Sequence, residues 1–278
     1  MKNILNIKAY YRTVRNFLLT ARQHRRLTYV LAKREISDRY IGQALGGVWA
    51  VLHPMLLLTV YFFLFSVVFK IRIPDSSGFP TDYFLYILSG LAPWLAFAES
   101  TNKGPVAVYS QSSLVKQVVF PIEILPLKGV LTSFVPLLVM GSLLLVYKLV
   151  KGEALFPGLL LLPAALLLQI VLCTGINMLT SAVGTYLRDL KDLIQALLLV
   201  VIYLMPIFYL PEMVPNAFRP LIAWNPLSHL VWCWQDVFYY NAFAHPWSWL
   251  IVGAGSVLTL AVGTRVFAFL KTYFGNVL

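Results

Sequence analysis

The sequence predicts an all-α, polytopic membrane protein with six transmembrane helices. Hydrophobic residues make up 59% of the 278 residues and charged residues only 12%, whereas a soluble domain is about one-quarter charged. Several runs exceed about 18 mostly apolar residues, the length that a helix needs to cross the hydrocarbon core. The net charge of +11 therefore indicates membrane topology and lipid contact, and we expect no binding to nucleic acid.

Residues 1–45 precede the first apolar run and are expected to form a cytoplasmic amphipathic interface helix region. One face of the helical wheel is apolar and carries Tyr11, Val14, Phe17, Leu18 and Ala21. The other face is basic and carries Arg12, Arg15, Arg22 and Arg26. Such a helix is typical of the membrane interface, although it could also serve only to set the orientation. No short apolar core with a cleavage site occurs here, so we expect this region to be retained.

Residues 46–278 are expected to form one transmembrane domain. The six predicted spans are 47–69, 83–102, 124–147, 155–184, 193–210 and 246–270. If the N-terminus is cytoplasmic, this layout places 17 of the 22 Lys and Arg residues on the inner side. The positive-inside rule then predicts that both termini are cytoplasmic. Glu99 and Lys128 fall near the inner ends of their spans, where long side chains can reach water.

The outer connection 211–245, between spans five and six, is much longer than an ordinary loop. Its four prolines and many aromatic residues predict two short helices, at about 213–223 and 227–240. We expect them to form a re-entrant helical hairpin, because non-spanning helices are tolerated where protein covers them. The candidate gate residues are Trp232, Trp234, Tyr239 and Tyr240. A plain interfacial belt of aromatic side chains is the alternative.

The segment LVKQVVFPIEILPLK, residues 114–128, lies on the predicted cytoplasmic side between spans two and three. A short helix is expected over 112–119, and Pro121 should end it because proline disfavours a helical residue before it. The same proline suits the first turn of the next helix, where Glu123 would lie near the positive end of the helix dipole. The segment could be a rigid lever for a partner protein or simply a connecting loop.

Motifs for catalysis and for nucleotide binding are missing from the sequence. There is no GxxxxGK[ST] loop for phosphate, no GxSxG elbow, and no pair of histidines at metal-ligand spacing. We therefore expect no catalytic residue, no metal site and no cofactor in this chain. Ionisable residues within the spans are also sparse, which argues against transport driven by an ion gradient.

Four stretches together resemble the permease subunits of type-2 ABC exporters for polysaccharides, O-antigens and teichoic acids. They are LAKREISDRYIGQALGGVWAVLHP (31–54), LSGLAPWLAFAES (88–100), SLVKQVVFPIEILPL (113–127) and YLRDLKDLIQALLLVVIYLMPIFY (186–209). The third, with its Phe-Pro-x-Glu-x-Leu-Pro core, and the fourth are the specific ones. The resemblance covers about residues 28–245 and implies a multi-pass protein of the bacterial inner membrane.

The resemblance further implies a homodimer of this chain with two copies of a separate ABC nucleotide-binding subunit. That subunit would hold ATP and Mg²⁺, and this chain would not be an enzyme. Short cytoplasmic helices after span two contact the ATPase in this family. Carried to this sequence, ATPase coupling falls on Gln111, Leu114, Lys116, Phe120, Pro121 and Glu123, with help from Arg188 and Asp189.

The implied cargo is a polyprenyl-pyrophosphate-linked glycan. Aromatic side chains stack on sugar rings at low conformational cost. The candidate path residues are Trp49, Tyr61, Phe62, Phe65, Tyr203, Phe208 and Tyr209; simple packing is the alternative for each of them. The candidate pyrophosphate-binding residues are Lys33, Arg34, Arg39 and Tyr40, because arginine forks suit phosphate oxygens. Contact with anionic lipid headgroups is the alternative.

Three other functions fit the sequence less well. A type-2 exporter of a small amphiphile or drug would share the interface helix and the aromatic hairpin, but the third and fourth stretches favour glycans. An integral-membrane glycosyl- or acyltransferase would need a His/Asp pair or paired carboxylates at one membrane face. A passive channel would need spans lined by polar residues, which this sequence does not offer.

Overall fold

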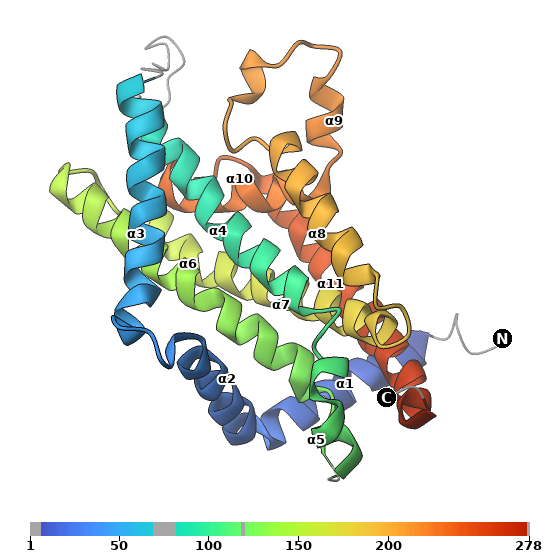
Figure 1. Ribbon diagram of the computed structural model, residues 1–278. Helices are drawn as coiled ribbons and strands as arrows, with labels where there is room; N and C mark the ends of the chain where they lie inside the picture. The colour runs from blue at the N-terminus through green and yellow to red at the C-terminus, as the bar shows by residue number, and fades with distance from the viewer. Residues whose placement is uncertain (1–6, 69–81, 118–119, 277–278) are drawn as a thin grey trace.

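The computed structural model describes residues 7–68, 82–117 and 120–276, and all regular structure among them is helical (Figure 1). Parts of three expected elements, 1–6, 69 and 118–119, lie outside the described residues. The helices are α1 (Ile7–Gln23), α2 (Arg25–Tyr40), α3 (Trp49–Phe62), α4 (Tyr83–Lys103), α5 (Ser112–Gln117), α6 (Ile124–Val150), α7 (Leu162–Gly184), α8 (Leu190–Val201), α9 (Arg219–Ala223), α10 (Pro226–Phe238) and α11 (Pro246–Leu270).

Four helices among the described residues are long and apolar enough to cross a membrane. They cover Gly46–Phe65, Ile124–Val150, Gly158–Gly184 and Pro246–Gly275. The other two predicted spans correspond to α4 and α8, which are not among the four, so the six-span layout stays a prediction. Most side chains of α4 are buried by protein, and a helix surrounded by protein does not need a lipid-facing apolar surface.

Helix α4 forms the centre of the bundle and packs on α6 and α10. Its start is held by Asp82, whose carboxylate accepts the backbone N–H of Leu85 at 3.2 Å and the hydroxyl of Tyr147 at 2.7 Å. Lys151 Nζ lies 2.5 Å from the same carboxylate. Burial raises the pKa of Asp82, but the hydrogen bonds from Lys151 and Tyr147 outweigh it and leave the pKa below its ordinary value. These contacts join the start of α4 to the end of α6.

Helices α7 and α11 approach each other closely through glycines. A Cβ added to Gly263 would lie 2.1 Å from the carbonyl oxygen of Gly175, and one added to Gly175 would lie 2.4 Å from the backbone nitrogen of Leu260. Neither position has room for a side chain. The hydroxyl of Ser256 donates to the carbonyl of Leu168 at 3.0 Å along the same contact. Small residues thus allow two apolar helices to pack backbone against backbone.

The connection 211–245 contains two short helices, α9 and α10. Helix α10 matches the predicted 227–240 closely, but α9 covers only Arg219–Ala223 of the predicted 213–223, because residues 214–218 are turns and extended chain. Asn225 caps α10 by accepting the backbone N–H of Leu227 at 3.0 Å, and proline 226 occupies the first helical position. Figure 1 shows α10 lying across the bundle behind α4, and its side chains are mostly buried. The structure contains no membrane, so the re-entrant position of this pair of helices stays a prediction.

Helix α1 lies at the same end of the bundle as α5 and the C-terminal end of α11 (Figure 1). Its Phe17 is buried against Val108, Met178 and Phe267, which belong to three other segments. Part of the apolar face that we expected to contact lipid is therefore covered by the bundle. Tyr11 and other apolar side chains at the edge of that face remain exposed, and the interface position of α1 stays a prediction.

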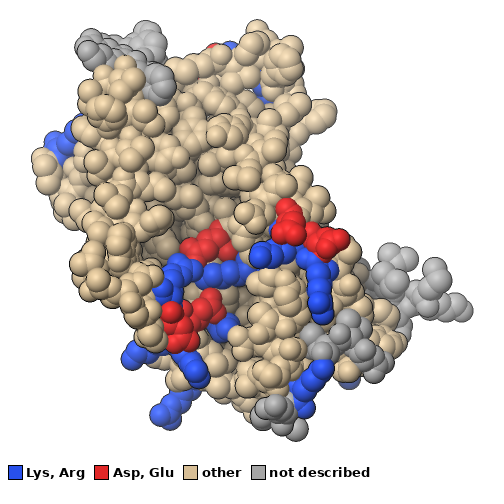
Figure 2. All heavy atoms as spheres, in the orientation of Figure 1, with Lys and Arg blue, Asp and Glu red and all other residues tan. Residues whose placement is uncertain are grey.

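Charged side chains are distributed unevenly over the molecule. Figure 2 shows that, on the face seen in Figure 1, Lys, Arg, Asp and Glu gather towards the end where α2 and α5 lie, and most of the rest of this face is uncharged. An uncharged zone beside a charged end is the distribution expected for a chain that spans a membrane.

Candidate functional site

Aromatic side chains from α3, from the helical turn Phe63–Val68 that continues it, and from the segment after α8 form one cluster. The Tyr61 ring stacks on Phe208 with 5.9 Å between centroids, and Phe65 stacks on Phe208 at 6.1 Å. Tyr203 lies 6.2 Å from Phe208, and its side chain is 70% exposed. Four predicted path residues from distant parts of the chain are therefore brought together.

The other predicted path residues lie around or away from this cluster. The hydroxyl of Tyr209 donates to the carbonyl of Tyr203 at 3.1 Å. Phe62 points to a different neighbour, Phe84, with 5.0 Å between the centroids. Trp49 lies near the opposite end of α3, in a cavity described below.

The position of Phe208 results from a break in the chain after α8. The helical turn Ile202–Leu204 ends before Pro206, and residues 205–210 are irregular and partly buried. The carbonyl of Pro206 accepts hydrogen bonds from the Tyr86 hydroxyl at 2.9 Å and from Gln235 Nε2 at 3.0 Å, and the hydroxyl of Tyr83 donates to the carbonyl of Phe208. Buried carbonyls need such donors, so α4 and α10 hold this segment in place.

A cavity of about 720 Å³ lies between the end of α2, α3, α4 and α6. Its lining combines apolar side chains, among them Leu57, Leu95 and Met140, with several polar groups. The polar and aromatic lining comprises Arg39, Tyr40, Gln43, Trp49, His53, Glu99, Asn102 and Lys103. Two of the four residues predicted for pyrophosphate, Arg39 and Tyr40, therefore share this cavity with Trp49. The other two, Lys33 and Arg34, do not line it, and both are exposed on α2.

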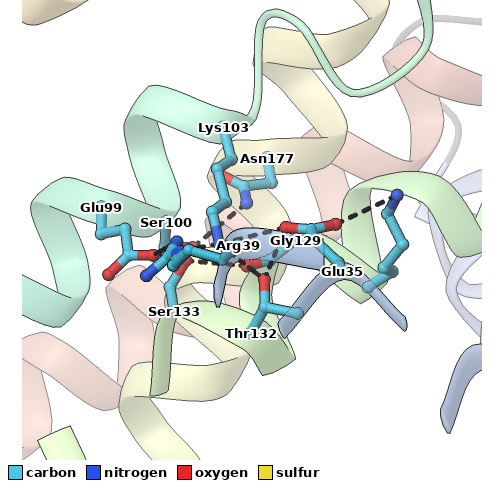
Figure 3. A network of polar contacts seen from close by, with 10 residues as sticks. Glu35, Arg39, Glu99, Ser100, Lys103, Gly129, Thr132, Ser133 and Asn177 are labelled. Atoms are coloured by element: carbon cyan, nitrogen blue, oxygen red, sulfur yellow. Dashed lines mark hydrogen bonds and ion pairs between the residues drawn. The ribbon is translucent and has the colours of Figure 1, made fainter. Parts of the chain in front are cut away.

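A network of ion pairs adjoins the cavity and joins α2, α4 and α6 (Figure 3). Glu35 on α2 lies 3.1 Å from Lys103 Nζ through one carboxylate oxygen and 3.0 Å from Lys128 Nζ through the other. Lys103 is also 3.1 Å from Glu99, and Glu99 accepts a hydrogen bond from Arg39. The charged side chains in this network are between 14% and 40% exposed.

Electrostatics favour the charged forms of Glu35 and Arg39 in this network. Burial raises the pKa of Glu35, but Lys103 and Lys128 lower it by more, so the pKa lies below its ordinary value of 4.5. Burial lowers the pKa of Arg39, but the hydrogen bond to Glu99 raises it by more, so the net pKa is above its ordinary value and the guanidinium stays charged. Three cations thus face two carboxylates, and the network carries one excess positive charge towards the cavity.

Sequence reasoning missed the assembly of this network. It placed Glu99 and Lys128 at span ends where they would reach water, and it did not single out Glu35 or Lys103. The available signal was spacing: Glu35 and Arg39, and likewise Glu99 and Lys103, are four residues apart and share a helix face. That spacing indicates charged stripes on two helices but does not say that the two stripes meet.

The segment predicted to couple to an ATPase forms the short helix α5, followed by proline 121 before α6 begins. Lys116 is exposed, as are Arg188 and Asp189 in the turn between α7 and α8. Gln111 and Leu114 line a second cavity, of about 470 Å³, with Glu35 and Lys128.

Two predicted coupling residues lie directly before α6. Phe120 is half-buried. Glu123 is the residue that precedes the first turn of α6 but makes no side-chain cap, and its carboxylate instead lies 2.7 Å from Lys271 Nζ. This ion pair ties the start of α6 to the residue that follows α11.

The four predicted gate residues lie on or beside α10 in two environments. Trp234 and Tyr239 are each 1% exposed and pack in the core. Trp232 stacks on His245 with 5.7 Å between centroids, and Tyr240 contacts the same ring at 5.0 Å. A gating movement would therefore have to move α10 itself.

A buried carboxylate organises this region. Asp236 on α10 accepts His245 Nδ1 at 2.7 Å and Trp249 Nε1 at 2.9 Å. Among the described residues, no group of three His, Cys, Asp or Glu side chains is placed to hold a metal ion. The described part of the site thus consists of cavities, ion pairs and stacked rings.

Sequence similarity to known proteins extends over most of this chain. A family model described as ABC-2 type transporter matches residues 26–239. An O-antigen export system permease protein RfbA from Klebsiella pneumoniae is 27% identical over 91% of this chain and 95% of its own length. A protein of the same name from Myxococcus xanthus is 30% identical over 88% and 92%. The polysialic acid transport protein KpsM from Escherichia coli is 26% identical over 71% and 75%.

Proposed function

Because this chain belongs to the ABC-2 type transporter family, we propose that it is the permease subunit of an exporter for an O-antigen-like polysaccharide. The observation that carries the proposal is the similarity to polysaccharide export permeases over nearly the full length of both chains. The alternatives, an exporter of small amphiphiles or a membrane transferase, have no counterpart among these relatives. The chain has the all-helical architecture and the apolar helices that such a subunit needs.

The proposed energy source is ATP hydrolysis on a separate subunit, because this sequence has no phosphate-binding loop. Two copies of that subunit would contact α5 and the turn that contains Arg188 and Asp189. Two observations support these segments as one docking region. Both have exposed side chains, and the backbone leading into one packs closely against the backbone leading into the other. A Cβ added to Gly184, at the end of α7, would lie 2.3 Å from the carbonyl oxygen of Pro105 in the connection from α4 to α5.

The proposed transport path lies between two copies of this chain, along α3 and α8. Both helices bury few of their own side chains, only Pro54 on α3 and Ile194 on α8 among the described ones. Apolar surface of this kind needs either lipid or a second protein. In a homodimer, the cluster of Tyr61, Phe65 and Phe208 would present stacked rings to a passing glycan.

The proposed attachment point for a polyprenyl pyrophosphate is the larger cavity, with Arg39 and Tyr40 as the groups that contact phosphate oxygens. A guanidinium binds phosphate through two parallel N–H donors, and the excess positive charge of the neighbouring network attracts an anion. Lys33 and Arg34 would attract anionic headgroups from outside the cavity. In this arrangement α4 and α8 complete six spans of the bacterial inner membrane, with both termini in the cytoplasm.

Native mass spectrometry of the complex, purified gently from its own membrane, tests the class of protein. The expected result is two copies of this chain with two copies of a phosphate-loop ATPase and a bound polyprenyl-pyrophosphate glycan. Recovery of this chain alone with ordinary phospholipid would contradict the proposal.

The substrate path is tested separately by Tyr61→Ala and Phe208→Ala, with Trp247→Ala as the control. Trp247 is 75% exposed, on α11 and outside the cluster. We expect slower glycan export or a changed glycan length distribution for the two cluster variants only. Unchanged export in both would rule out the aromatic path.

A further inference from the structure

Lys103, the last residue of α4, is shared by three helices. Its Nζ lies 3.1 Å from Glu35 on α2, 3.1 Å from Glu99 on α4 and 2.6 Å from the hydroxyl of Thr132 on α6. An ammonium group has three N–H donors, so each donor has one partner on a different helix. Figure 3 shows these side chains converging on the Lys103 side chain.

Lys103 also borders both cavities. It lines the larger one together with Arg39 and Glu99, and the smaller one together with Glu35 and Gln111. Lys103 therefore lies between the residues proposed to bind phosphate and the connection that leads to α5.

The chain that follows Lys103 has little freedom to absorb a movement. A Cβ added to Gly104 would lie 2.1 Å from the hydroxyl oxygen of Thr180 on α7, and Pro105 is in backbone contact with Gly184. Only a short connection then separates this point from the start of α5 at Ser112. Closely packed segments move as units rather than deform, so a shift at the end of α4 is passed towards α5.

We propose that Lys103 is a positioning residue that transmits the binding of a phosphate group in the larger cavity to the α5 segment. The proposal rests on the proposed phosphate site. A phosphate bound to Arg39 competes with Glu99 for that guanidinium. Glu99 then interacts more strongly with Lys103, and Lys103 withdraws from Glu35, which keeps Lys128. A ligand shifts a conformational equilibrium only if it binds one state more tightly than the other. Here the phosphate would bind more tightly to the state in which Glu99 has left Arg39 and pairs with Lys103.

The test uses the complex of this chain with its ATPase subunit in phosphatidylcholine nanodiscs. Polyprenyl pyrophosphate is the probe, and nanodiscs with phosphatidylglycerol form a second arm, because a lipid headgroup offers the same phosphate chemistry. Spin labels on introduced cysteines at Tyr29 and Ser113, both exposed, report the distance between α2 and α5. The two native cysteines, Cys173 and Cys233, are buried.

In the wild type, polyprenyl pyrophosphate should shift the distance between the labels and raise ATP hydrolysis several-fold over the basal rate. Lys103→Met should bind the labelled probe more weakly, because Lys103 lines the cavity and carries part of its positive charge, and at saturating probe it should still lose both the shift and the stimulation. Lys103→Arg, which keeps the charge, should restore them at least in part. Arg12→Met removes an exposed cation of α1, outside the path and the docking region, and should behave as wild type. If Lys103→Met does not assemble, Glu35→Gln removes the α2 partner and serves the same test.

The outcomes separate the two proposals. Probe binding with an unchanged shift and unchanged stimulation in Lys103→Met overturns the role of Lys103 but leaves the phosphate site intact. Failure of the wild type to bind the probe overturns the phosphate site and, with it, this inference. A shift produced equally by phosphatidylglycerol supports the transmission through Lys103 with a headgroup as the anion.

Discussion

Glu35→Gln should destabilise the folded chain by about 2–3 kcal/mol. The Glu35 carboxylate pairs with Lys103 and Lys128 at 3.1 and 3.0 Å. At an effective dielectric constant of about 20, each pair has a Coulomb energy of roughly 5 kcal/mol before desolvation is subtracted. Removing one partner of a buried pair costs about 3–5 kcal/mol. The expected loss is smaller because these three side chains are 14–28% exposed.

The measurement is the free energy of unfolding in mixed micelles of dodecylmaltoside and SDS, followed by tryptophan fluorescence. The control is Asp38→Asn on the same helix, whose carboxylate lies 3.6 Å from Arg34 with both side chains largely exposed; it should change stability by less than about 0.5 kcal/mol. The double variant Glu35→Gln with Lys128→Met should be more stable than the sum of the single effects, because it removes one charge of each sign and so keeps the net charge of the wild-type network. Equal stabilities of Glu35→Gln and Asp38→Asn would refute the reasoning.

Three further predictions concern the pH dependence of stability, the packing of α7 on α11, and the ion pair between Glu123 and Lys271. The pKa of Glu35 in the folded protein lies below its ordinary value of 4.5. The ionised Glu35 carboxylate should therefore stabilise the fold fully above about pH 4.5, and this contribution should be lost as the pH falls through the folded pKa. In Glu35→Gln, the free energy of unfolding should lack this part of its dependence on acid pH. Gly263→Ala places a Cβ 2.1 Å from the Gly175 carbonyl oxygen and should lower the free energy of unfolding by about 2 kcal/mol or more. The control Gly255→Ala, with open space around it, should leave that free energy unchanged. Equal melting temperatures of the two variants would contradict the close packing of α7 on α11. Glu123→Lys should weaken the stimulation of ATP hydrolysis by substrate, and adding Lys271→Glu should recover most of it, since the swapped pair can form again; no recovery in an ATPase assay would mean that Glu123 acts through the partner subunit instead.

Several local features of this protein follow from sequence alone because they depend on neighbouring residues. The apolar content and run lengths indicate a helical membrane protein, and proline 121 with the preceding polar stretch predicts the short helix that the structure contains as α5. The prolines of 211–245 likewise predict the two short helices α9 and α10. Chain-local steric and hydrogen-bonding preferences determine such boundaries.

The packing of these helices was decided by tertiary contacts. The sequence shows an amphipathic α1 but not that Phe17 contacts the bundle, and it shows aromatic residues in α10 but not that Trp234 is enclosed. An apolar face can be buried equally well by lipid or by protein, and composition does not distinguish the two.

The charge network is the clearest case of what only the tertiary structure decides. Arg39 and Glu99 are 60 residues apart in sequence, and Thr132 lies 97 residues from the Glu35 carboxylate to which it donates. The strength of an ion pair depends on its distance and its surroundings, and both are set by how α2, α4 and α6 pack. The residue types supply the charges, and the fold determines which charges meet and leaves one positive charge uncompensated beside the cavity.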